Sequence, residues 1–112
     1  MSSHSPTSHR FYSQRLRLYY VEWGDPKAPT IVFVHGVREY GRTWDDLLAH
    51  FVDDYHIVVP DLRGHGDSEW VQGSGYDYLD YLYDLYQLIV QNDFGPVVLV
   101  GHSLGGAITS FF

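Results

Sequence analysis

The sequence predicts an α/β domain in which helices cover both faces of a mostly parallel sheet. Three short apolar runs, rich in β-branched residues, stand at 30–34, 55–59 and 96–100. Segments in which apolar residues recur at helical spacing lie between and after these runs. Strands that alternate with helices form crossover units, which make neighbouring strands parallel. Continuous apolar strands of this kind are typical of a sheet that is buried on both faces.

The chain begins with a polar stretch rich in Ser and His, residues 1–9, which predicts a disordered tail. The domain is then expected to span residues 10–112. Between 10 and 22, large apolar side chains recur at every second position, which predicts one or two strands in a hairpin at the edge of the sheet. Gly and Pro residues at 24–29 predict a turn before the first apolar run.

Three segments have the apolar spacing of helices. The first covers 42–51, with Thr43 as the expected N-cap and two acidic residues in its first turn. In the second, Leu, Tyr and Ile side chains recur over 79–89, and Asp77 is the expected N-cap. The third begins at Leu104, after the last apolar run. Each helix therefore follows one of the predicted buried strands.

Composition excludes several classes of function. Seven basic and fourteen acidic side chains give a formal net charge of −7, which argues against a nucleic-acid or anionic-membrane surface. The absence of Cys excludes disulfides, thiolate metal sites and a Cys nucleophile. The start lacks the apolar run of a signal peptide, and no stretch is long and apolar enough for a membrane span. The charge is compatible with a neutral or cationic small-molecule partner, and we expect a cytoplasmic protein without a cofactor.

The motif that carries most chemical information is Gly101-His102-Ser103-Leu104-Gly105, a G-x-S-x-G pattern between an apolar strand and a helical segment. A sharp strand-to-helix turn forces Ser103 into a strained backbone conformation, and only glycines two positions away let the chain pass itself. Such a turn holds the hydroxyl clear of the sheet at a helix N-terminus, where negative charge is stabilised. Ser103 is the predicted nucleophile. The motif alone leaves open a simple glycine-rich turn with an N-capping Ser.

Two further motifs accompany this turn. His35-Gly36 follows the first apolar run, and the segment 61–68 has the pattern D-x-R-G-x-G-x-S after the second. With all three motifs, residues 10–112 resemble the serine-nucleophile branch of the α/β-hydrolase fold family. The resemblance implies a sheet of about eight strands, of which this chain supplies about five.

The resemblance also implies how a reacting carbonyl is bound. In this family the amide after the His-Gly pair and the amide after the nucleophile form the oxyanion hole. Carried over, the donors are the backbone N–H groups of Val37 and Leu104, and one such donor stabilises a transition state by about 3 kcal/mol. The loop 37–42 and Trp70 are expected to line part of the substrate pocket.

The other motif residues resemble architectural positions of the family. His35 is expected to hold the loop after its strand. Asp61 and Arg63 are expected to brace the loops around the elbow, and Gly64 and Gly66 to permit tight backbone turns. None of these side chains is expected to react with substrate.

A serine hydroxyl needs a base, which in this family is a His oriented by an acid, both placed after the Ser in the chain. Nine residues follow Ser103, and none is acidic or His. His35 and His65, at the same edge of the sheet, are the only histidines that could substitute. We therefore expect the chain to be the N-terminal part of a serine hydrolase and to be inactive alone.

Ser103 favours acyl transfer on ester, thioester, lactone or related carbonyl substrates over the alkyl-ester chemistry of family members with Asp as nucleophile. Two alternatives stay open: a perhydrolase, and a non-catalytic α/β-hydrolase-like module that uses its surface for binding. A flavodoxin-like or nucleotide-binding domain is disfavoured, because the sequence has neither a G-x-G-x-x-G pattern nor a P-loop Lys.

Overall fold

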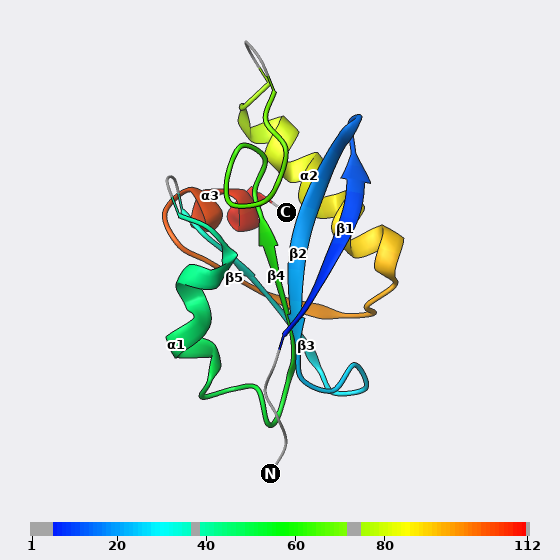
Figure 1. The fold of residues 1–112 in the computed structure, drawn as a ribbon, viewed down its shortest axis with the longest axis vertical. Coiled ribbons are helices and arrows are strands. Elements are labelled where there is room, and N and C mark those ends of the chain that lie inside the picture. Colours follow the sequence, from blue (N-terminus) through cyan, green and yellow to red (C-terminus); the bar gives the residue numbers. More distant parts are fainter. Residues whose placement is uncertain (1–5, 37–38, 72–74, 112) are drawn as a thin grey trace.

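In the residues that the structure describes, five strands form one sheet in the order β1-β2-β4-β3-β5 (Figure 1). The computed structural model describes residues 6–36, 39–71 and 75–111. The strands are β1 Thr7–Ser13, β2 Leu16–Trp23, β3 Thr30–Val34, β4 His56–Asp61 and β5 Val97–Gly101. The helices are the 3-10 helix η1 Gly41–Trp44, α1 Asp45–Leu48, α2 Tyr78–Asn92 and α3 Leu104–Phe111.

The three apolar runs form the parallel part of the sheet, as the sequence predicts. β3 lies between β4 and β5 and is parallel to both, with Ile31 opposite Ile57 on one side and Val98 on the other. β1 and β2 form an antiparallel hairpin, and β2 pairs antiparallel with β4. The predicted α/β class and the edge hairpin are confirmed, and the hairpin makes the sheet a mixed one.

Side chains of the central strands alternate between two apolar cores, one on each face of the sheet. On one face, alternate residues of β3 and β4 pack against α2 and α3, with Val32, Val34, Val58, Leu85, Leu88 and Ile108 buried. On the other face, the intervening residues pack against α1 and the turn after it, with Ile31, Phe33, Ile57, Val59, Leu48 and Val52 buried. Helices therefore cover both faces, with α2 and α3 on one face and α1 on the other.

The first strand begins earlier than the sequence predicts. Residues 7–9 were expected in the disordered tail 1–9 but belong to β1, where His9 lies opposite Tyr20. The His9 ring stacks on Tyr20 at 4.9 Å, and its Nε2 lies 2.9 Å from Glu22 Oε1. Polar residues occur in this strand because it lies at the sheet edge, where one side of each residue faces water. Residues 1–5 lie outside the described part of the chain.

The first helix is shorter than the predicted segment 42–51. The chain forms η1, then a single turn of α1, and then hydrogen-bonded turns in which Phe51 N–H donates to Leu48 O. Thr43 is not an N-cap, because Tyr40 precedes η1 and the Thr43 hydroxyl accepts from Tyr40 N–H at 3.3 Å. The apolar spacing still buries Leu48 against the sheet. The pattern therefore identified the buried face but not the helix length.

The predicted cap of α2 is confirmed. The Asp77 carboxylate accepts from Asp80 N–H at 3.1 Å, and the Asp80 carboxylate accepts from Asp77 N–H at 3.3 Å. β4 extends beyond the predicted run 55–59, through Pro60 to Asp61. No helix in the described ranges combines the length and apolar character needed to cross a membrane.

Candidate active site

The carboxyl ends of β3, β4 and β5 meet at one edge of the sheet, and Ser103 stands there on the turn between β5 and α3. Its φ of +57° lies in the left-handed region, although it is not a glycine. Its side chain is exposed. A strained, exposed residue of this kind is typical of a functional position, since the fold must compensate for its conformation.

The two glycines of the turn are required by close packing. A Cβ on Gly101 would lie 2.3 Å from Gly105 O. A Cβ on Gly105 would lie 2.1 Å from Val34 O and 2.6 Å from His35 O, so the first turn of α3 presses directly on the end of β3. This agrees with the prediction that only glycines let the chain pass itself at these positions. This close contact between α3 and β3 also determines how far Ser103 lies from the sheet.

The loop after β3 contacts the elbow. A Cβ on Gly36 would lie 3.0 Å from Ser103 Cβ, so the His-Gly motif passes directly beside the predicted nucleophile. Leu104 is the first residue of α3, a position whose amide has no partner within a helix. Val37 lies outside the described residues. The oxyanion-hole role of both amides therefore stays a prediction.

His35 holds the loop rather than facing the nucleophile. Its side chain is fully buried, Nε2 accepts from Leu62 N–H at 3.0 Å, and Nδ1 lies 2.7 Å from Gly36 O. Because Nε2 must accept, the proton of the neutral ring is on Nδ1 and donates to Gly36 O. The ring thus ties the loop after β3 to the loop after β4, which is the architectural role that the sequence predicts.

Asp61 braces the same two loops. Its buried carboxylate accepts from Gly41 N–H at 2.6 Å, at the start of η1, and from Asp67 N–H at 3.0 Å. Gly66 must be a glycine, because its φ is +51° and a Cβ there would lie 2.4 Å from Asp61 Oδ2. Gly64 likewise has a φ of +75°. The contacts agree with the predicted bracing and turn roles of these residues.

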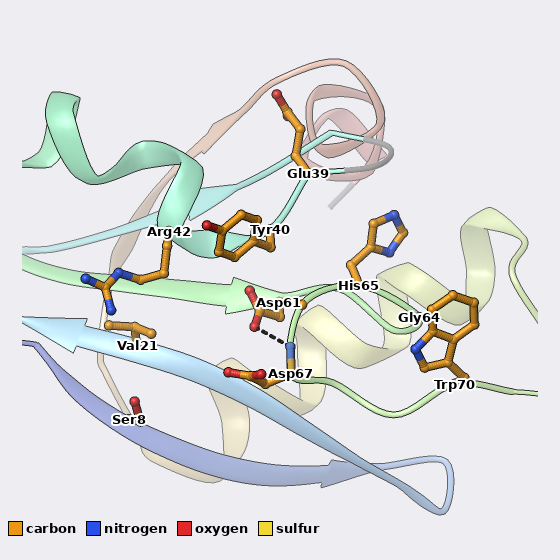
Figure 2. Close-up of a pocket in the computed structure, with 11 residues that line it drawn as sticks. Ser8, Val21, Glu39, Tyr40, Arg42, Asp61, Gly64, His65, Asp67 and Trp70 are labelled. Carbon is orange, nitrogen blue, oxygen red and sulfur yellow. Dashed lines mark hydrogen bonds between the residues drawn. The ribbon is translucent and has the colours of Figure 1, made fainter.

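Among the described residues, three open clefts lie near the carboxyl ends of the strands. The largest of the three, about 650 Å³, is lined by residues of the loops after β3 and β4 and lies between Arg42 and Trp70 (Figure 2). A cleft of about 220 Å³ is lined in part by His102, and one of about 390 Å³ by Leu104 and three Tyr side chains. The residues on either side of Ser103 therefore each line a cleft. The expected pocket residue Trp70 lies at the largest cleft and is 74% exposed.

The fold and this edge of the sheet can be compared with known proteins. Residues 31–111 match the model of the Alpha/beta hydrolase family, which covers well over half of the chain. This chain belongs to the α/β-hydrolase family.

Individual members of the family are similar over most of the chain. It is 38% identical over 94 residues to a 3-hydroxybutyrate-oligomer hydrolase of Cupriavidus necator, covering 82% of this chain and 32% of that protein. It is 38% identical over 92 residues to the non-heme chloroperoxidase CPO-A1 of Kitasatospora aureofaciens, covering 81% and 32%. A crystal structure of an α/β hydrolase from Novosphingobium aromaticivorans superposes with a TM-score of 0.90 at 28% identity, covering 98% and 40%. The chain spans about a third of the length of these curated relatives.

Glu39 belongs to the loop 37–42 that was expected to line the pocket, and it lines two of the clefts, but the sequence did not reveal its contacts with the elbow. Its Oε1 accepts from Gly36 N–H at 2.8 Å and lies 3.3 Å from His102 Nδ1. The hydrogen bond from the Gly36 amide, with a smaller contribution from His102, lowers the pKa of this carboxyl below its ordinary value of 4.5. Glu39 thus joins the loop after β3 to the elbow. An acid in a Gly-containing loop gives no sequence signal of where it points.

Arg63 braces the loop after β4 and also ties it to α2, a partner that the sequence did not predict. Its Nε donates to Asp84 Oδ2 at 2.6 Å, its Nη2 to Asp84 Oδ1 at 2.9 Å, and its Nη1 to Gly75 O at 2.8 Å. Both charged side chains are buried. Sequence analysis missed Asp84, although its place on the apolar face of α2, beside Tyr81 and Leu85, was the available signal.

The described residues do not supply a base for Ser103. No imidazole in that part of the chain makes a hydrogen bond to Ser103, and His35, His65 and His102 each bond to other groups. The same residues contain no group of three or more His, Asp or Glu side chains arranged to hold a metal ion.

We expect His35 to make stability depend on pH. Burial lowers its pKa below the ordinary 6.5, since the charged ring would lose its solvation and Nε2 could not accept from Leu62 N–H. Below pH 6.5 the unfolded chain binds a proton that the folded one resists, so the free energy of unfolding falls by up to about 1.4 kcal/mol per pH unit. Urea unfolding of the full-length gene product at about pH 7.5 and 5.5 measures this loss. In His35→Gln the loss of unfolding free energy between these two pH values should be smaller by about 1.4 kcal/mol. An unchanged loss would contradict the expectation.

Proposed function

We propose that this chain carries the nucleophile and oxyanion-binding amides of a serine hydrolase that acts on ester, thioester, lactone or related carbonyl substrates. The proposal rests chiefly on Ser103, an exposed residue in the left-handed region on a turn whose neighbours Gly101 and Gly105 admit no side chain. A mere N-capping Ser does not require a positive φ. Membership of the α/β-hydrolase family and the hydrolase relative support the same chemistry.

In the proposed reaction, Ser103 Oγ attacks the substrate carbonyl carbon while a base removes the hydroxyl proton. The carbonyl oxygen becomes an oxyanion, which accepts from the amides of Leu104 and Val37. Collapse of this intermediate breaks the bond to the leaving group, which takes the proton from the protonated base. Water then adds to the acyl-enzyme in the same way, releasing the acid and restoring Ser103.

We propose that the base and its acid lie outside the described residues, because no imidazole among these makes a hydrogen bond to Ser103. His35 is fully committed to Leu62 and Gly36, and protonating its Nε2 would remove an acceptor from a buried amide. We therefore propose that the 112 residues alone do not turn over substrate. They supply the nucleophile, its strained turn and the loop beside it.

A serine-directed fluorophosphonate probe tests the proposal on the full-length gene product. We expect one probe per folded molecule, located at Ser103 by peptide mass spectrometry, with no adduct at that site in Ser103→Ala. Ser110→Ala is the matched control, since Ser110 is an exposed serine on α3, the helix that follows Ser103, and its hydroxyl donates to Gly106 O at 2.7 Å. Ester hydrolysis should fall by at least about 10⁴-fold in Ser103→Ala. A folded protein that does not react with the probe would favour the non-catalytic binding module.

A second candidate is perhydrolase activity, favoured by the 38% identity to a non-heme chloroperoxidase. In this reaction hydrogen peroxide takes the place of water and receives the acyl group from Ser103, giving a peracid. Adding peroxide to the same assay should then yield peracid at the expense of free acid. Hydrolysis alone under those conditions would eliminate this candidate.

A further inference from the structure

Glu39 stands beside the predicted nucleophile, between two clefts. Its Oε1 would lie 2.9 Å from a Cβ on Gly36, and Ser103 Cβ would lie 3.0 Å from the same point, so carboxylate and serine flank one glycine. Figure 2 shows the Glu39 side chain directed toward the segment that joins β5 to α3. The residue lines both the 650 Å³ cleft and the 220 Å³ cleft. A substrate group that occupies either cleft therefore lies beside this carboxylate.

The charges of the largest cleft do not neutralise Glu39. Of the described residues that line it, Glu39, Asp61 and Asp67 are acidic, and Arg42 is the only Lys or Arg. Arg42 is engaged elsewhere, since its Nε donates to Asp45 Oδ2 at 2.7 Å. The Asp61 carboxylate is buried and bonded to two amides. Glu39 is therefore the described acid that both lines the clefts and lies against the elbow.

We propose that Glu39 determines specificity by charge, disfavouring substrates with a negative group near the scissile carbonyl relative to neutral ones. The inference rests on the proposed function, because it concerns which substrates Ser103 receives. Every substrate develops the same oxyanion, so that charge cancels when two substrates are compared. What differs is the repulsion between Glu39 and a fixed anionic group. At a solvent-exposed site, the repulsion between two negative charges several ångströms apart changes the relative rate about three- to tenfold.

The test compares two p-nitrophenyl esters of equal chain length, one ending in a methyl group and one in a carboxylate. The ratio of their kcat/KM values is measured on the full-length gene product and on Glu39→Gln. Glutamine keeps an oxygen that can accept from Gly36 N–H, so the variant removes the charge and preserves the contact. Because both rates come from one preparation, their ratio does not depend on the folded fraction.

The matched control is Asp46→Asn, which removes the same charge from an exposed position on α1 that lines none of the three clefts. We expect Glu39→Gln to raise the relative rate on the anionic ester about three- to tenfold, Asp46→Asn to leave it nearly unchanged, and about 0.5 M salt to shrink the difference. An unchanged ratio in Glu39→Gln, or an equal rise in Asp46→Asn, would overturn the inference alone. Hydrolysis that persists in Ser103→Ala would instead overturn the proposed function and the inference together.

Discussion

Gly105→Ala is expected to destabilise the protein by about 3 kcal/mol or more and to slow reaction at Ser103 by about 100-fold or more. The new Cβ would lie 2.1 Å from Val34 O and 2.6 Å from His35 O. Both are backbone atoms at the end of a central strand, so no side chain can rotate away. α3 must instead move off the sheet, and Ser103 moves with it.

Gly106→Ala is the matched control for this substitution. It lies one residue further along the same helix, where a Cβ would meet Gly101 O at 3.5 Å, an ordinary contact. Because alanine favours helix over glycine, this variant should be unchanged or more stable by up to about 1 kcal/mol. Urea unfolding and the rate of phosphonate labelling measure the two effects. Equal behaviour of the two variants would show that the close approach of α3 to β3 is not needed.

The features that the sequence predicted correctly are those that depend on neighbours along the chain. Three continuous apolar runs became the three parallel strands. β3 and β4 are buried on both faces, as such runs predict, whereas β5 lies at the edge of the described sheet and its Val98 is 60% exposed. Asp77 caps α2 because its partner amide is three residues away. Gly101 is likewise required by one turn of backbone, since a Cβ there would lie 2.3 Å from Gly105 O. In each case, the residues that determine the structure lie within a short segment.

The features that were missed depend on contacts between distant segments. Residues 7–9 are too polar to signal a strand, but pairing with β2 and the contacts of His9 with Tyr20 and Glu22 extend β1 through them. Glu39 is placed by Gly36 and by His102, and His102 lies 63 residues away in the chain. Periodicity and composition do not indicate which distant residues contact one another, so these contacts could not be predicted from one sequence.

Asp84 is the strongest case of this kind, since it joins three segments under the edge hairpin. Besides its two hydrogen bonds from Arg63, its Oδ1 accepts from Ser13 Oγ at 2.5 Å and from Gln14 Nε2 at 3.2 Å. It therefore ties α2 to the end of β1 and to the loop after β4. The carboxylate is buried, and its hydrogen bonds replace the water that it loses.

Arg63→Met is expected to lower the free energy of unfolding by about 3 to 5 kcal/mol, because it leaves the buried Asp84 carboxylate without its counter-charge. Methionine retains most of the side-chain volume, so the loss reports on charge and hydrogen bonding. Arg42→Met is the matched control. It breaks an Arg–Asp pair of similar length, 2.7 Å against 2.6 Å, at a partly exposed site, where such pairs contribute about 0 to 1 kcal/mol. Urea unfolding of both variants measures the contrast.

A double variant, Arg63→Met with Asp84→Leu, distinguishes an uncompensated charge from lost packing. If the cost of Arg63→Met comes from the carboxylate left alone in the core, removing that carboxylate should recover about half of the loss or more. If the cost came instead from the lost hydrogen bonds of Arg63, such as the one to Gly75 O, the second substitution would add to the first, because it also removes the acceptor of Ser13 and Gln14. A double variant less stable than Arg63→Met would therefore show that the ion pair acts through its hydrogen-bonded geometry. In that case, the position of α2 beside the site would depend on the pair itself.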